Sequence, residues 1–203
     1  MNLRFTFIPL FTLLAASLCL GQLPRTKIDS IYPLGGQQGT EVEITVTGKE
    51  ITDTQWLKFS HDGIKAVARK DDFGDNLPGK FEVSIGKDVP AGLYEVQVGG
   101  GRFGASNVDT FVVGALPEVL APSDNTSQEK AFEIEQGKTI TGKAVARNYS
   151  YFKFNAKKGQ ELLIHCAAEE IDSNLAPVIN ILDADGNELA SETTTGILDF
   201  SPV

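Results

Sequence analysis

The chain has 203 residues, of which 41% are hydrophobic and 22% are charged, so it is large and apolar enough for one large or two ordinary globular domains. This composition excludes global disorder and a coiled coil. Basic residues number 18 and acidic residues 27, and the resulting net charge of -9 would repel a phosphate backbone or an anionic lipid surface. We therefore expect no nucleic acid partner.

Residues 1–21 predict a secretory signal peptide. Arg4 precedes an apolar run over residues 5–20 that contains no acidic residue, and Cys19 and Gly21 are the small residues that precede a cleavage site before Gln22. Pro9 interrupts the run, which is also short for a permanent membrane helix, the alternative interpretation. We expect a secreted or cell-surface protein with no stable membrane span after signal cleavage.

Cleavage would remove Cys19 and leave Cys166 as the single cysteine of the mature chain. A lipoprotein signal would need a small residue before Cys19, and Leu18 occupies that position. One thiol makes no internal disulfide, so hydrophobic cores must hold the mature fold together in an oxidising compartment.

The first half of the mature chain alternates apolar and polar residues with the period of a β-strand, and no stretch shows helical spacing. The predicted strands are residues 27–31, 42–46, 55–60, 64–69, 81–85, 94–98 and 108–113. Turn clusters separate them, including residues 35–39 and 71–76. Seven short strands in about 90 residues predict an immunoglobulin-like sandwich over residues 26–114.

The alternation stops after Gly114, and the Pro-, Ser-, Asp- and Asn-rich residues 115–130 predict a linker. A second strand series then occupies residues 131–203. Its predicted strands are residues 131–135, 139–146, 149–155, 161–168, 177–182 and 188–192. The predicted fold is therefore all-β, with two consecutive β-sandwich domains after a signal peptide.

The first series resembles the IPT/TIG family of immunoglobulin-like domains. The resemblance lies in residues 28–40, IDSIYPLGGQQGT, followed by VTG at residues 46–48, VPAGLY at residues 89–94 and GASN at residues 104–107. It covers residues 26–114. The resemblance implies an immunoglobulin-like β-sandwich.

The second series resembles the bacterial pre-peptidase C-terminal domain through residues 151–162, YFKFNAKKGQEL, and residues 179–190, INILDADGNELA. The resemblance implies a jelly-roll-like sandwich appended to exported proteins. Where that family has Asp-x-Asp, this chain has Asn148-Tyr149-Ser150. The closing Gly-x-Tyr strand of the family is absent before Val203, so we expect an incomplete domain whose apolar face, including Phe152 and Phe154, is partly uncovered.

No catalytic residues and no cofactor are predicted. The G-x-G-x-x-G pattern at residues 99–104 follows a strand, but another strand rather than a helix comes next, which favours a hairpin over a dinucleotide loop. His165 and Cys166 are adjacent in a predicted strand and so point to opposite faces, while His61 belongs to the other domain. An enzyme complete within this chain is therefore disfavoured.

Two further features leave alternatives open. In the acidic turn at residues 183–187, Asp183, Asp185 and Asn187 resemble the start of a calcium loop, but Thr194 stands where an EF-hand needs a glutamate, and the turn residues suffice for a hairpin. We therefore predict no metal site. Trp56, the single tryptophan, is interpreted as a core side chain, with a sugar platform as the alternative.

These observations predict non-catalytic, exported binding, adhesion or spacer modules of a larger extracellular protein. The ligand would be an unknown extracellular protein or polysaccharide. The alternative is an accessory region of a secreted hydrolase, most naturally a peptidase, whose catalytic domain lies beyond residue 203. A fold does not determine a function, so this expectation comes chiefly from the two resemblances.

Overall fold

The structure is a computed structural model that describes residues 23–145, 147–173, 175–193 and 196–200. Within these residues the chain forms β-strands and two short 3-10 helices, η1 (Gln128–Lys130) and η2 (Glu169–Ile171), which confirms the all-β prediction. No helix in this part of the chain has the length and hydropathy of a membrane span. The predicted signal peptide, residues 1–21, lies outside the described residues.

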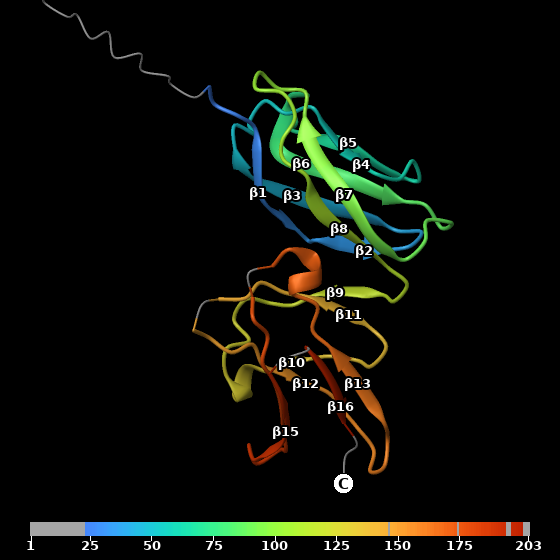
Figure 1. The fold of residues 1–203 in the computed structure, drawn as a ribbon, viewed down its shortest axis with the longest axis vertical. Helices are drawn as coiled ribbons and strands as arrows, with labels where there is room; N and C mark the ends of the chain where they lie inside the picture. The colour runs from blue at the N-terminus through green and yellow to red at the C-terminus, as the bar shows by residue number, and fades with distance from the viewer. Residues whose placement is uncertain (1–22, 146, 174, 194–195, 201–203) are drawn as a thin grey trace, which may run out of the picture.

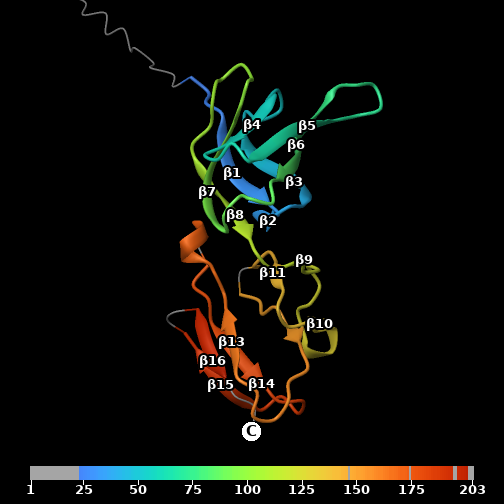
Figure 2. The ribbon, with the colours of Figure 1, turned by 90° about the vertical axis from the view of Figure 1, so that its right-hand side faces the viewer.

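The N-terminal part of the chain, β1 to β8, is a sandwich of two four-stranded sheets (Figure 1). Sheet A has the strand order β1 (Lys27–Tyr32), β3 (Glu41–Lys49), β6 (Asn76–Ile85) and β5 (Ile64–Lys70). Sheet B has the order β2 (Gly35–Gln37), β8 (Asp109–Gly114), β7 (Gly92–Gly99) and β4 (Trp56–Phe59). Figure 2 shows β6 and β7 on opposite sides of this sandwich.

The hydrophobic core of this part lies between the two sheets and follows the predicted two-residue alternation. Phe81 and Val83 of β6 are 1% and 0% exposed, and Val98 of β7 and Phe111 of β8 are both 0% exposed. The intervening residues of the same strands point outward, because successive side chains of a strand lie on opposite faces. The alternation in the sequence therefore identifies which residues of each strand point into the core and which point to solvent.

Of two glycine-rich segments, the structure contradicts the predicted conformation of one and confirms that of the other. Residues 35–39 were predicted as a turn, but Gly35–Gln37 forms the edge strand β2, which pairs in parallel with β8. Residues 99–104 form the predicted hairpin: the N–H of Gly104 donates to the carbonyl of Gly101 at 3.3 Å, and strand β8 rather than a helix follows.

The C-terminal part, β9 to β16, consists of strand pairs. The pairs are β9 (Glu118–Leu120) with β11 (Thr139–Thr141), β10 (Phe132–Glu133) with β12 (Phe152–Lys153), β13 (Leu162–His165) with β16 (Ile197–Phe200), and β14 (Ile179–Leu182) with β15 (Glu188–Glu192). Figure 2 shows β13 to β16 on one side and β9 to β11 on the other. Phe152 is 39% exposed, and Phe154 is half-buried.

The predicted linker, residues 115–130, includes strand β9 and helix η1. β9 forms regular structure because it pairs in parallel with β11, and the N–H of Thr139 donates to the carbonyl of Pro117 at 2.9 Å. The composition of this segment resembles that of a linker, yet its backbone groups find partners about twenty residues further along the chain, as a ladder between neighbouring strands allows.

Side chains also connect the two parts. The Lys143 ammonium lies 4.0 Å from the ring centroid of Tyr32, a cation–π contact. Gln37 Nε2 donates to the carbonyl of Ala115 at 3.1 Å. The η2 helix lies beside β8 in Figure 1, and this contact shapes the site described next.

Candidate functional site

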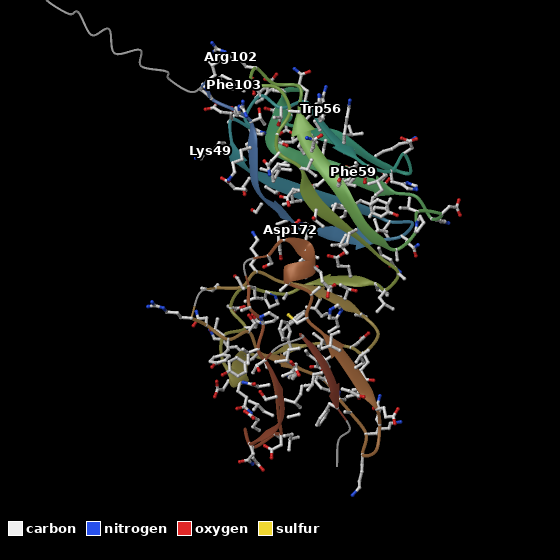
Figure 3. All side chains as sticks on the ribbon, in the orientation of Figure 1. Lys49, Trp56, Phe59, Arg102, Phe103 and Asp172 are labelled. Atoms are coloured by element: carbon white, nitrogen blue, oxygen red, sulfur yellow. The ribbon has the colours of Figure 1, made fainter. Side chains whose placement is uncertain are left out.

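Strand β4 places an aromatic side chain on the outer face of sheet B. Leu57 is 4% exposed and belongs to the core, and Phe59 packs edge-on against Phe111 with ring centroids 4.8 Å apart. Because side chains alternate along a strand, Trp56 and Lys58 point to the opposite side, away from the core. Figure 3 labels Trp56 and Phe59 on this strand. The interpretation of Trp56 as a core side chain is therefore wrong.

The indole of Trp56 lies across the backbone of two glycines on the neighbouring strand end. A Cβ added at Gly99 would lie 2.5 Å from Trp56 Cζ2, and one added at Gly100 would lie 2.7 Å from Trp56 Cδ1. No other residue type leaves room for the ring at these positions, since real Cβ atoms do not approach ring carbons so closely. Gly99 and Gly100, which belong to the G-x-G-x-x-G pattern at residues 99–104, thus leave the space that the Trp56 ring occupies.

Polar side chains surround Trp56 on the same face. The outer face of sheet B, as used below, comprises Trp56 and Lys58 of β4, Leu93, Glu95 and Gln97 of β7, and Thr110 and Val112 of β8. Lys58 pairs with Gln97 and Glu95 pairs with Thr110 across the strands. The face therefore combines an aromatic ring with ammonium, amide, carboxylate and hydroxyl groups.

Lys58 and Gln97 are held beside the ring. Lys58 Nζ lies 4.7 Å from the centroid of the Trp56 ring, a cation–π contact that brings the ammonium over the indole. Gln97 Nε2 donates to the carbonyl of Ser106 at 3.0 Å, which orients the amide plane. The polar groups next to Trp56 are thus positioned by contacts within the sandwich.

A hollow of about 240 Å³ lies at the other end of this face, where the C-terminal part meets sheet B. We call it the junction hollow, and its lining includes Leu93, Glu95, Val108, Thr110 and Asp172. Thr110 Oγ1 donates a hydrogen bond of 2.5 Å to Oδ2 of Asp172, the residue after η2. Figure 3 labels Asp172 next to the sheet.

The residues considered for nucleophilic catalysis are not brought together. Gly63 N donates to His61 Nδ1 at 3.0 Å within a turn of the N-terminal part. His165 Nε2 lies 3.1 Å from Oε1 of Glu170, whereas Cys166, which follows the end of β13, is half-buried. Burial raises the pKa of the Cys166 thiol, which disfavours the reactive thiolate.

The acidic turn at residues 183–187 forms the predicted hairpin between β14 and β15. Asp183 Oδ1 accepts hydrogen bonds from the N–H groups of Asp185 and Asn187 at 2.9 and 2.8 Å, and Oδ2 accepts one from Asn187 Nδ2 at 2.9 Å. The Asn187 amide is the main cause of the lowered pKa of Asp183. Among the described residues, no group of three or more His, Cys, Asp or Glu side chains is arranged to hold a metal ion.

A second concavity, of about 770 Å³, lies at the ends of β10 and β12 and escaped the sequence analysis. Gln160 Nε2 donates to Gln136 Oε1 at 2.6 Å, and Gln136 Nε2 donates to the carbonyl of Asn155 at 2.6 Å. Each of the two amide groups thus uses one of its two N–H donors within the chain. The concavity contains no aromatic side chain among its described lining residues.

The alternation in Trp56-Leu57-Lys58-Phe59 was the signal that could have placed Trp56 outward, because two apolar core residues alternate with the other two. No sequence signal identified Asp172, which lies 62 residues from its partner Thr110. The junction hollow was missed for that reason.

No protein-family model matches this chain, and no curated protein matches it in sequence. One solved structure to which the chain is similar is SGBP-B of a Bacteroides ovatus mixed-linkage glucan utilization locus, in complex with a mixed-linkage heptasaccharide. The similarity covers 88% of this chain and 36% of that chain, at 12% identity and a TM-score of 0.34. So distant a similarity assigns no ligand to this chain, and the argument below rests on the outer face alone.

Proposed function

We propose that this protein is an exported, non-catalytic binding protein that holds a polysaccharide on the outer face of sheet B. The observation that carries the proposal is the placement of Trp56, whose indole lies on the backbone of Gly99 and Gly100 on a face that points away from the core. The ring is half-buried and fixed by this packing. The Lys58 ammonium lies over the ring, 4.7 Å from its centroid, so a sugar ring that stacks on the indole must displace Lys58 from this position.

The chemistry of this face fits a sugar chain. A pyranose ring presents C–H groups on its faces and hydroxyl groups around its edge, so it needs an apolar surface beside hydrogen-bonding groups. Trp56 supplies the apolar surface, and Lys58, Gln97, Glu95 and Thr110 supply donors and acceptors next to it. Binding sites for small polar ligands commonly combine apolar walls with a few positioned polar groups.

A non-catalytic role is part of the proposal. His61 belongs to a turn of the N-terminal part, His165 contacts Glu170, and Cys166 has a raised pKa. A nucleophile needs a base within hydrogen-bond reach, and these three side chains do not supply such a pair. We therefore expect no nucleophilic catalysis by His61, His165 or Cys166.

Export is likewise proposed, from the signal-like residues 1–21 and from the resemblance of the chain to IPT/TIG and pre-peptidase C-terminal domains. Intact-mass analysis of the protein recovered from the exporting host should give a chain that begins at Gln22. A retained Met1 or a lipid on Cys19 would contradict this part of the proposal.

The binding proposal is tested by affinity electrophoresis of the purified full chain in gels that contain galactomannan, xyloglucan, dextran, polygalacturonate or chitosan. At least one polysaccharide should retard the wild type. Trp56→Ala should abolish most of the retardation, because loss of a central aromatic contact commonly weakens binding about tenfold or more. Phe73→Ala is the matched control, since Phe73 is an aromatic residue that is 92% exposed on the hairpin between β5 and β6. Unretarded wild type in every gel, or equal retardation of Trp56→Ala, overturns the proposal.

A further inference from the structure

The junction hollow continues the outer face away from Trp56. Trp56 pairs with Gly99 and Thr110 pairs with Glu95, and both Gly99 and Glu95 belong to β7. Four residues of a strand span about 13 Å at about 3.3 Å per residue. The two ends of the face are thus further apart than a single sugar ring is wide, so a ligand that reaches both must be a chain.

Asp172 closes the hollow from the C-terminal part of the chain. It follows η2 with a φ of 57°, in the left-handed region that aspartate adopts more readily than most residues. The N–H groups of Ile171 and Ser173 both donate to the carbonyl of Ala168, at 3.1 and 3.0 Å, and Ala168 is 3% exposed. A buried backbone anchor therefore sets the position of the Asp172 carboxylate.

The hollow offers both apolar and hydrogen-bonding surface. Leu93 and Val108, which are 54% and 50% exposed, line it together with the Thr110 hydroxyl and the Asp172 carboxylate. A carboxylate accepts about four hydrogen bonds. The bond from Thr110 therefore leaves acceptor capacity on Asp172 for the hydroxyl groups of a ligand in the hollow.

The charges at the two ends of the face are opposite. Glu95, Asp109 and Asp172 line the hollow, and its described lining includes no basic residue. At the other end, the Lys58 ammonium lies over Trp56. An anionic chain is repelled in the hollow and attracted at Lys58, and a cationic chain the reverse, so neither sign of charge matches both ends, and an uncharged chain carries no such mismatch.

From these observations we infer that the junction hollow is a second subsite for the polysaccharide, that the polysaccharide is uncharged, and that Asp172 completes the subsite from the C-terminal part of the chain. The inference rests on the proposed function, because it assumes that Trp56 holds the first part of the same sugar chain. It adds the ligand class and a residue that determines the length of chain that is bound.

The test is calorimetric titration of the full chain with a disaccharide and a hexasaccharide of each neutral polysaccharide that retards the chain in the gels above. The wild type should bind the hexasaccharide at least about tenfold more tightly than the disaccharide, because the second contact adds to the first within one ligand. Asp172→Ala should lose about tenfold for the hexasaccharide and nothing for the disaccharide. Asp72→Ala, on the exposed hairpin between β5 and β6, is the matched control.

Thr110→Val is the second variant, since it removes the same contact from the sheet side without changing charge. It should reproduce part of the loss with the hexasaccharide, and circular dichroism melting should show both variants folded. Trp56→Ala should weaken the binding of both the disaccharide and the hexasaccharide, and unchanged binding would contradict the proposed function itself. Wild-type affinity of both folded variants for the hexasaccharide, or tighter binding of polygalacturonate or chitosan than of any neutral chain, would overturn the inference alone.

Discussion

The indole of Trp56 covers Gly99 so closely that a Cβ on this glycine would lie 2.5 Å from Cζ2 of the ring. The two residues are direct partners in the antiparallel ladder between β4 and β7. A large side chain therefore faces a residue without one, and the ring occupies the space that a side chain at Gly99 would fill. This arrangement explains why Trp56 is fixed although it lies outside the core.

Gly99→Ala should displace the Trp56 ring. The added methyl group must push the ring outward, because the neighbouring backbone of the ladder is held by β7 and β4, and such overpacking costs about 1–3 kcal/mol. Thermal melting should show the loss of stability, and the retardation of the protein in polysaccharide gels should decrease as well. Gly92→Ala, on the same strand with no atom within 4 Å of the added Cβ, should change neither. Equal behaviour of the two variants would contradict the packing described.

Phe111→Ala should lower the free energy of unfolding of the sandwich. Phe111 is 0% exposed and packs against Phe59, so its truncation leaves a cavity in the core. A substitution of this kind costs about 3–5 kcal/mol. Chemical denaturation monitored by the fluorescence of Trp56 measures the change, and Phe73→Ala should stay within about 0.5 kcal/mol of the wild type because Phe73 is 92% exposed. A small effect of Phe111→Ala would mean that the core repacks around the cavity.

The strands of the sandwich could be predicted because a half-buried strand alternates apolar and polar residues along the sequence. Val83 and Val98 stand two residues from other core side chains, and that period alone identifies which residues share a face. The period says nothing about which strand lies next to which. Gly35–Gln37 was missed as a strand because its residues favour a turn, and only pairing with β8, more than seventy residues later, makes it a strand.

The candidate site was predicted less well for the same reason. That Trp56 is a candidate sugar platform followed from its residue type, but its position over Gly99 depends on the register between β4 and β7. The contact between Thr110 and Asp172 depends on how the C-terminal part lies against sheet B. Hydrogen bonds between residues so far apart in sequence leave no periodic signal, so the junction hollow could only come from the structure.

The Cys166 thiol should react slowly with alkylating reagents in the folded protein. Burial raises its pKa, so at pH 8 less of it is the nucleophilic thiolate than in a free cysteine. The proposed mature chain, which begins at Gln22, has this thiol alone. Iodoacetamide labelling followed by mass spectrometry should be slow in buffer and fast in guanidinium chloride. Rapid labelling of the folded chain would contradict the half-buried position of Cys166.

The turn between β14 and β15 should lose stability in acid through Asp183. Its carboxylate accepts hydrogen bonds from Asn187 and from backbone N–H groups, and these bonds lower its pKa in the folded state. A lowered folded pKa means that the contribution of Asp183 is complete above the ordinary aspartate pKa of about 3.9 and is lost as the pH falls below it. The melting temperature of Asp183→Asn should therefore lie below that of the wild type at pH 7, and the difference should shrink toward pH 3.

Asp185→Asn removes the same charge from the same turn but keeps the N–H that bonds to Asp183, so its melting temperature should remain near that of the wild type. A gap between Asp183→Asn and the wild type that stays constant down to pH 3 would show that the ionised carboxylate does not hold this turn.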